Sequence, residues 1–136
     1  MKCIKKWVLS EPIVDPIDQN DILTDTCTFF DLDLKTCTTA DLEFLKKFHL
    51  NVTMDGPVYG FVTWFDCMFS KGNKKITLST SPYKKSTHWK QTIFYLDKPI
   101  DVSIGQSIAG ELKVAKATDN PRELNVRLEF SVSDSA

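Results

Sequence analysis

The chain has 136 residues, of which 42% are hydrophobic and 26% charged, and its formal net charge at pH 7 is -1. This length suits one domain with a real hydrophobic core, and the composition is typical of a globular chain rather than a disordered one. The near-zero charge gives no support to nucleic-acid binding through phosphate contacts, and no apolar run is long enough to span a bilayer. We therefore expect neither nucleic acid nor a membrane as a partner.

The first stretch, residues 1–22, lacks alternating apolar and polar residues and contains Pro12 and Pro16. It is predicted to be an extended arm that stays outside the sheet. Its apolar run from Trp7 to Leu9 is too short for a signal peptide, so we expect an intracellular protein of the cytoplasm or nucleus. The apolar side chains of the arm need cover, so the arm is expected to dock on its own domain or on a partner.

Residues 23–136 are predicted to form an all-β domain, because alternation of apolar and polar residues recurs along them. The expected strands cover residues 30–34, 48–54, 58–69, 76–78, 89–96, 100–104, 108–114 and 124–132. Turn residues separate them, as at Asp55-Gly56-Pro57, Lys71–Lys74 and Asp97-Lys98-Pro99. Short strands at this spacing favour a sandwich or a barrel-like antiparallel sheet, because closure hides the strand edges.

Two segments differ in pattern from the rest of the predicted domain. Residues 58–69 are apolar on both faces, which indicates a central strand. Only residues 39–47 look helical, with Thr38 or Thr39 as a possible N-cap, and this segment is too short for more than a turn or two.

Metal and nucleotide sites have little support. The chain has four cysteines, Cys3, Cys27, Cys37 and Cys67. They could form two disulfides, but without an export signal we expect free thiols. There is no CxxC pair and there are only two histidines, His49 and His88, so no metal site is expected. The glycines form neither a GxGxxG nor a GxxxxGK(S/T) pattern, so no phosphate-binding loop is expected.

The pair His88-Trp89 is the main candidate for chemistry, because it follows a polar loop at the start of an expected strand. Its imidazole can hold charge near neutral pH, and its indole face suits a cation. A strand that simply begins with two amphipathic side chains explains the pair as well. A hydrolase that uses Ser79 or Ser86 is a third reading, but no nucleophile elbow surrounds either serine.

The residues around this pair resemble a known family. The stretch LSTSP at 78–82, followed by THWKQTIFYL at 87–96, is similar to the THW-loop region of protein arginine N-methyltransferases. Further similar stretches are CIK at 3–5, EPIVD at 11–15, DLDL at 31–34, DLEF at 41–44, WFD at 64–66, Gly110, and RELN at 122–125. The THW form resembles the type I group, which makes asymmetric dimethylarginine.

The resemblance implies a division of the chain and three residue roles. Residues 1–22 would be the end of the family's dimerisation arm, and residues 23–136 its substrate-binding β-barrel. Thr87 would shape the loop and bind substrate, His88 would be catalytic by positioning active-site acids, and Trp89 would line the pocket for the guanidinium.

The resemblance also implies partners and a cofactor. The substrates would be arginine-containing proteins, and the parent enzyme would be a homodimer. S-adenosylmethionine and two catalytic glutamates would belong to a Rossmann domain that this chain lacks, so the chain alone is expected to be inactive. A barrel strand of the family is also missing, and the sheet edge that this leaves unpaired is expected to make the chain self-associate. The alternative is a non-catalytic protein-interaction barrel.

Overall fold

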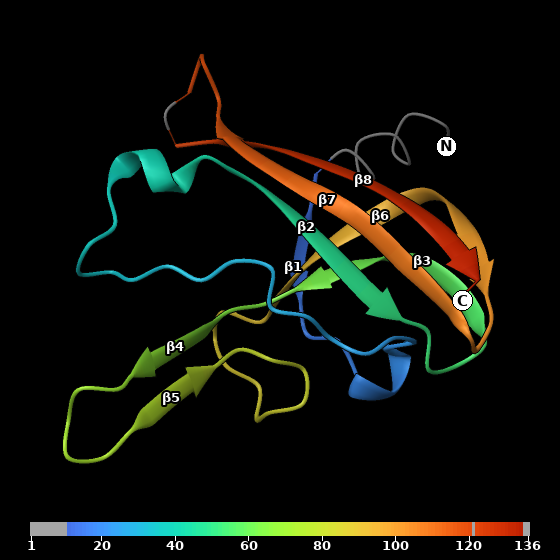
Figure 1. The fold of residues 1–136 in the computed structure, drawn as a ribbon, viewed down its shortest axis with the longest axis horizontal. Coiled ribbons are helices and arrows are strands. Elements are labelled where there is room, and N and C mark those ends of the chain that lie inside the picture. The colour runs from blue at the N-terminus through green and yellow to red at the C-terminus, as the bar shows by residue number, and fades with distance from the viewer. Residues whose placement is uncertain (1–10, 121, 135–136) are drawn as a thin grey trace. The chain divides into compact units, whose positions relative to one another are not determined.

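The computed structural model describes residues 11–120 and 122–134 (Figure 1). These residues form two compact units. The first unit contains residues 11–23 and Gly56–Asp101, and the second contains Thr24–Asp55 and residues 102–134. Each unit is mostly strand, and the only helices in the described ranges are two short 3-10 turns. The prediction of an all-β chain is therefore confirmed.

The first unit contains two sheets. Strands β1 (Ile13–Asp15), β3 (Gly56–Thr63) and β6 (Gln91–Val102) form a three-stranded sheet in the order β1-β6-β3. Strands β4 (Asp66–Phe69) and β5 (Ile76–Ser79) form a separate antiparallel hairpin. The 3-10 turn η1 (Gln19–Asp21) follows β1, and the Asp18 side chain accepts a hydrogen bond from its Asn20 N–H.

The second unit is one antiparallel sheet in the order β2-β7-β8. Its strands are β2 (Phe44–Asn51), β7 (Gln106–Lys116) and β8 (Leu124–Asp134). The central strand β7 carries the buried side chains Ile108, Leu112 and Val114, because it has a partner on both sides. The 3-10 turn η2 (Thr39–Leu42) leads into β2.

Several expected strands agree with these elements. The expected strands at 76–78, 108–114 and 124–132 correspond to β5, β7 and β8. The apolar face of β8 is less buried than its alternation suggests, since Leu124 is exposed and Leu128 and Phe130 are half-buried. Strand β8 lies at the edge of its sheet, so fewer neighbours cover it.

The helical prediction for residues 39–47 is wrong beyond its first turn. Thr38 does precede a 3-10 turn, where the Asp41 carboxylate accepts hydrogen bonds from the Thr38 N–H (2.7 Å) and hydroxyl (2.8 Å). From Phe44 onward the chain is strand β2, which pairs with β7 along its whole length. Ladder pairing with a long neighbouring strand outweighs the weak helical preference of these residues.

Three other predicted elements differ from the structure. The central strand expected at 58–69 is broken at Trp64 and Phe65 into β3 and β4. The turn expected at Asp97-Lys98-Pro99 is absent, because β6 continues through it to Val102. Proline is tolerated there because β1 pairs only with Gln91–Ile93 among the described residues, so one side of the later strand needs no donor.

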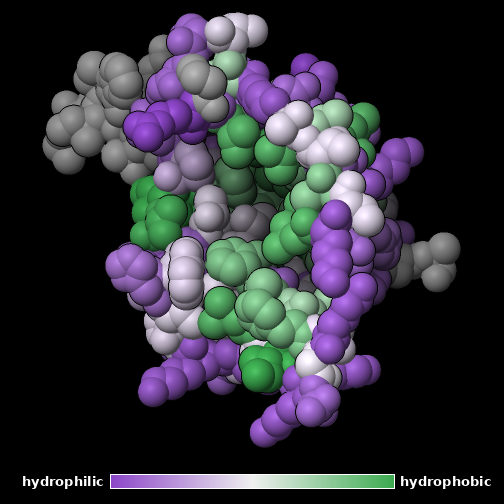
Figure 2. Space-filling model, turned by 90° about the vertical axis from the view of Figure 1, so that its left-hand side faces the viewer, coloured by the Kyte–Doolittle hydropathy of each residue, from purple (hydrophilic) through white to green (hydrophobic). Residues whose placement is uncertain are grey.

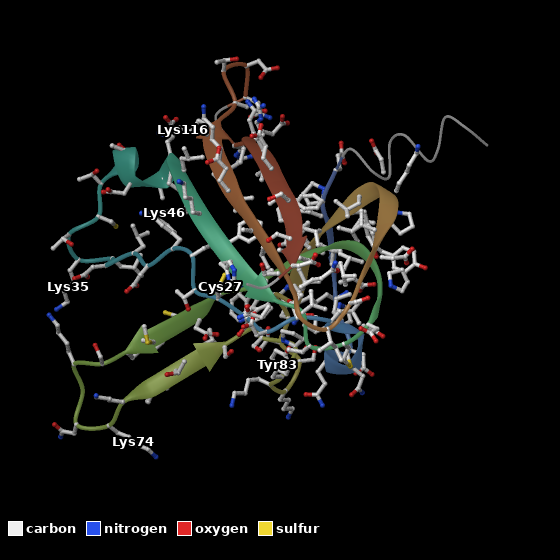
Figure 3. All side chains as sticks on the ribbon, turned by 45° about the vertical axis from the view of Figure 1, so that its right-hand side comes forward. Cys27, Lys35, Lys46, Lys74, Tyr83 and Lys116 are labelled. Carbon is white, nitrogen blue, oxygen red and sulfur yellow. The ribbon has the colours of Figure 1, made fainter. Side chains whose placement is uncertain are left out.

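The predicted strand at 30–34 is also absent, and the chain there is irregular. Its one aromatic ring nevertheless makes contacts: Phe30 stacks on Phe44 with centroids 4.2 Å apart, and the Lys46 ammonium lies 5.6 Å from the Phe30 ring (Lys46 is labelled in Figure 3). Cation–π and stacking contacts thus hold this irregular segment against β2.

The predicted arm is only partly described. Residues 1–10, which include Cys3 and the run from Trp7 to Leu9, lie outside the described residues. Within the described part, Ile13–Asp15 pairs antiparallel with β6, so the prediction that the arm stays outside the sheet is wrong for these three residues. The boundary between an arm at 1–22 and a barrel at 23–136 stays a prediction.

Apolar side chains reach the surface, as Figure 2 shows on one face. Several of them, including Met68, Phe69 and Ile76, lie on the β4–β5 hairpin. Cys27, Cys37 and Cys67 are free thiols. Within the described ranges, no helix has the length and apolar character needed to cross a bilayer.

Candidate functional site

The candidate site is the loop between β5 and β6, in the first unit. Figure 3 labels Tyr83 on this loop. The loop ends in a turn in which the Lys90 N–H donates to the Thr87 carbonyl oxygen at 3.3 Å. Lys90 has φ = 54°, which makes it the sole non-glycine residue with positive φ in the described chain. Such a conformation costs on the order of 1–2 kcal/mol in an L-residue, so the turn is held by its surroundings.

The turn presents His88 and Trp89 to solvent. Trp89 is 55% exposed, and its ring meets Phe65 edge-to-face with centroids 6.2 Å apart. The His88 ring lies at 6.4 Å from the Trp89 ring, also edge-on. The strand therefore begins at Gln91, and not at Trp89 as predicted. The reading of Trp89 as an ordinary buried strand residue is not supported, because the indole keeps more than half of its surface free.

Thr87 is the first residue of this turn. The residue is half-buried, and its hydroxyl oxygen is buried with no hydrogen-bond partner among the described residues. A buried hydroxyl without a partner is uncommon in folded proteins. Thr87 therefore has an unused donor and acceptor next to His88 and Trp89.

The start of the loop is held by hydrogen bonds to the residues between β3 and β4. The Thr80 hydroxyl donates to the Phe65 carbonyl oxygen and accepts from the Phe65 N–H, both at 3.0 Å. The Ser79 hydroxyl donates to the Asp66 carboxylate at 2.5 Å, and it accepts from the Ser81 N–H. These bonds explain why the expected strand at 58–69 is interrupted at Phe65, whose backbone groups bond to Thr80 instead.

The end of the loop is joined to β1 and to the residues that follow it. The Lys90 ammonium lies 3.0 Å from the Asp15 carboxylate. The side chain of Gln91 accepts a hydrogen bond from the Ile17 N–H at 2.9 Å and donates one to the Thr80 carbonyl oxygen at 2.7 Å. Neither Gln91 nor Thr80 was predicted from sequence to have a role of its own. The sequence did contain one signal that could have found Gln91: it is a polar residue on the same strand face as the apolar Ile93.

The arrangement limits the possible chemistry. Within the described chain, His88 makes no hydrogen bond with Ser79 or Ser86, so the hydrolase reading gains no support. The described residues contain no group of three His, Cys, Asp or Glu side chains arranged to hold a metal ion. What the loop does offer is an exposed aromatic face beside an imidazole, a combination suited to a planar cation.

The second unit has a shallow, open hollow of about 430 Å³ on its sheet. Its lining residues are Lys47, Phe48, Ala109, Gly110, Glu111, Glu129, Phe130 and Ser131. A Cβ at Gly110 would lie too close to the Phe48 ring and to the Phe130 Cβ, so only a glycine fits there. The loop in the first unit, where the exposed Trp89 lies beside His88, is the better candidate.

Comparison with known proteins gives one family and several relatives. The model of the arginine methyltransferase oligomerization subdomain matches residues 1–135. Protein arginine N-methyltransferase 1 of Schizosaccharomyces pombe is 41% identical over 128 residues, which cover 94% of this chain and 38% of the relative. The Dictyostelium discoideum protein of the same name is 38% identical over 131 residues, covering 96% and 38%. The chain thus spans less than two-fifths of the length of these relatives.

Solved structures agree in fold. A chain of the Trypanosoma brucei PRMT1 enzyme-prozyme heterotetrameric complex with AdoHcy matches with a TM-score of 0.87 at 26% identity, covering 98% of this chain and 45% of that one. Arabidopsis thaliana protein arginine methyltransferase 10 matches with a TM-score of 0.92 at 22% identity, covering 99% and 41%. The sequence, the strands and these likenesses lead to one assignment: the chain belongs to the arginine methyltransferase oligomerization subdomain family and corresponds to the C-terminal region of protein arginine N-methyltransferases.

Proposed function

We propose that this chain is the substrate-binding and dimerisation region of a type I protein arginine N-methyltransferase, an enzyme that transfers methyl groups from S-adenosylmethionine to arginine side chains of proteins. The observation that carries the proposal is the exposed indole of Trp89, fixed edge-on against Phe65 in a chain of this family. An exposed aromatic face held in one orientation is a ready surface for a planar cation.

In this proposal Trp89 lines the pocket for the substrate guanidinium. A guanidinium is planar and stays charged at all physiological pH values, so it stacks on an indole face with an energy of about 0.5–2 kcal/mol. A lysine ammonium offers no such planar match. This difference supports arginine as the target side chain.

His88 and Thr87 take supporting roles. The exposed His88 imidazole, edge-on to Trp89, is free to hydrogen-bond a carboxylate that orients the guanidinium. Thr87 shapes the turn, since its carbonyl oxygen closes it through Lys90. Its unpartnered hydroxyl can bond a group that arrives with substrate or with the rest of the enzyme.

The cofactor and the catalytic glutamates are proposed to come from residues outside this chain. The complex of the Trypanosoma brucei relative contains AdoHcy. The helices of the described residues are turns of three and four residues, and no glycine-rich turn among these residues leads into a longer helix. The proposal therefore gives this chain substrate binding and leaves methyl donation to the rest of the enzyme.

A chimaera tests the proposal. This chain replaces the matching 128 residues of the Schizosaccharomyces pombe relative, and methyl transfer to an arginine peptide is measured. Trp89→Ala should lower kcat/KM by roughly 100-fold, because both cation–π attraction and orientation of the guanidinium are lost. Tyr59→Ala is the matched control, since Tyr59 is 59% exposed and lies on β3, away from the loop. Equal activity of Trp89→Ala and Tyr59→Ala would remove Trp89 from the pocket.

A second role, self-association, is favoured by the family description and by the exposed apolar side chains of the β4–β5 hairpin. We propose that residues 1–22 act as the end of a dimerisation arm, that residues 23–136 close into a barrel, and that the parent enzyme is a homodimer. Sedimentation velocity of the 136-residue chain should show a dimer or larger species. A monomer at high concentration would contradict self-association. It would not affect the methyltransferase proposal, which the chimaera tests separately.

A further inference from the structure

Two polar side chains are almost completely buried at the two ends of the candidate loop. Thr80, at its start, is 1% exposed, and Gln91, directly after its end, is 4% exposed. Polar groups are buried at a cost unless their hydrogen bonds are satisfied. Both residues meet this condition, and the bond from the Gln91 amide to the Thr80 carbonyl oxygen joins the two ends of the loop.

Gln91 holds three segments together. Its amide nitrogen donates to the Thr80 carbonyl oxygen at 2.7 Å, which closes the loop from Thr80 to Gln91. Its amide oxygen accepts from the Ile17 N–H at 2.9 Å, in the segment that follows β1. The Asp15 backbone also pairs with Gln91 in the β1–β6 ladder. Gln91 therefore joins the loop to residues within the predicted arm.

Thr80 extends the connection to Trp89. The Thr80 hydroxyl bonds to both backbone groups of Phe65, and the Phe65 ring packs against the Trp89 ring. Trp89 is thus held from two directions, through its ring by Phe65 and through the backbone, two residues on, by Gln91. The connection from Ile17 through Gln91, Thr80 and Phe65 to Trp89 is continuous.

We propose that Gln91 is a positioning residue for the Trp89 face, which it sets by tying the ends of the loop to each other and to Ile17. A glutamine suits this task because its amide donates and accepts at the same time, whereas an apolar side chain of similar size does neither. The inference rests on the proposed function for its purpose, and on the hydrogen bonds alone for its geometry. It gives the segment after β1 a direct physical link to the substrate loop.

The test uses the 136-residue chain and NMR measurements that need no substrate. Gln91→Met keeps the side-chain volume but removes both hydrogen bonds. We expect amide exchange at Ile17 to accelerate by at least about tenfold and the nuclear Overhauser effects between Trp89 and Phe65 to weaken, with β2-β7-β8 amides unchanged. The control is Gln106→Met, because Gln106 also makes two side-chain bonds, to the Ser103 N–H and to Asp134, in the other unit.

A second variant keeps the test decisive if Gln91→Met does not fold. Gln91→Glu retains the acceptor for the Ile17 N–H but places a carboxylate against the Thr80 carbonyl oxygen. The expected result is a protected Ile17 amide together with weakened contacts between Trp89 and Phe65. Wild-type contacts between Trp89 and Phe65 in either folded variant would overturn the inference, as would equal effects from Gln106→Met.

The enzymatic readout separates this inference from the proposed function. In the chimaera, Gln91→Met should raise KM for the arginine peptide roughly tenfold with a smaller change in kcat, because the binding face is loosened rather than removed. An undisturbed loop in Gln91→Met overturns the positioning role and leaves the proposed function intact. A loop disturbed as expected, in a protein whose activity is insensitive to Trp89→Ala, upholds the positioning of Trp89 and overturns the proposed function.

Discussion

The two units of the chain differ in how their strands are held. In the second unit, β7 pairs with eight residues of β2 and with eleven of β8. In the first unit, β6 and β3 have twelve and eight residues, but β1 has only three, and β4 and β5 have four each. Of the buried polar side chains in the described chain, Thr80, Ser81 and Gln91 belong to the first unit, and only Ser107 to the second.

The two units are therefore stabilised by different kinds of contact. Long ladders with an apolar central strand give a rigid framework. The first unit instead uses buried hydrogen bonds to hold an irregular loop with an exposed indole and a strained Lys90. Side-chain hydrogen bonds fix one arrangement of a loop where apolar contacts allow several. The candidate site therefore lies where buried polar contacts hold the loop.

The largest expected effect in this comparison is Gly110→Ala in the framework. A Cβ there would lie 2.7 Å from the Phe48 ring and 2.9 Å from the Phe130 Cβ, and it would also meet the Glu129 carbonyl oxygen. Because the backbone of β8 must move away, the free energy of unfolding should fall by about 3 kcal/mol in urea titration.

The matched control is Gly72→Ala at the turn between β4 and β5. The nearest atom to a Cβ at Gly72 is 3.6 Å away, which is ordinary contact. This variant should change stability by no more than about 0.5 kcal/mol. Equal losses of stability in Gly110→Ala and Gly72→Ala would contradict the claim that β7 and β8 are packed more tightly than the β4–β5 turn.

The smallest expected effect is a pH dependence at η2. Hydrogen bonds from the Thr38 N–H and then from its hydroxyl hold the pKa of the Asp41 carboxyl below its ordinary value of 3.8. A folded-state pKa below the unfolded-state value means that ionised Asp41 stabilises the fold above about pH 4, and that this contribution is lost as pH falls through the lowered pKa. Asp41 is fully exposed, so the contribution is small.

Asp41→Asn should therefore lower Tm slightly at neutral pH, and the difference from wild type should disappear in strong acid. Asp101→Asn is the control, because Asp101 is exposed and makes no side-chain hydrogen bond within the described chain. A Tm difference for Asp41→Asn that persists unchanged into strong acid would show that its ionisation is not the cause.

Alternation along the sequence predicted β7 and β8 well, although it divided the longest strand, β6, in two. Residues 108–114 and 124–132 keep one apolar face over many residues, and both lie in strands. The break at Phe65 could not be predicted, since it depends on a hydroxyl fifteen positions later in the chain. The start of strand β2 at Phe44 could not be predicted either, because this strand is stabilised by its ladder with β7 rather than by the preferences of its own residues.

The site was predicted in part. The loop before β6 and its residues Thr87, His88 and Trp89 were expected from sequence, and their roles stay proposals. The sequence could not show that Trp89 is exposed, or that Lys90 adopts a positive φ. It also could not show the contacts of Gln91, because a hydrogen bond to Ile17 spans 74 positions. Long-range polar contacts leave no periodic signal.

The central claim is that the Trp89 face receives an arginine guanidinium. The chimaera is labelled with 5-fluorotryptophan, the Trp89 signal is assigned with Trp89→Phe, and the protein is titrated with an arginine peptide and with the same peptide carrying neutral citrulline. We expect the arginine peptide to shift the Trp89 fluorine signal and the citrulline peptide to shift it far less, while the Trp64 signal stays in place. A Trp89 signal that does not move at saturation with a peptide that the enzyme methylates would contradict the claim.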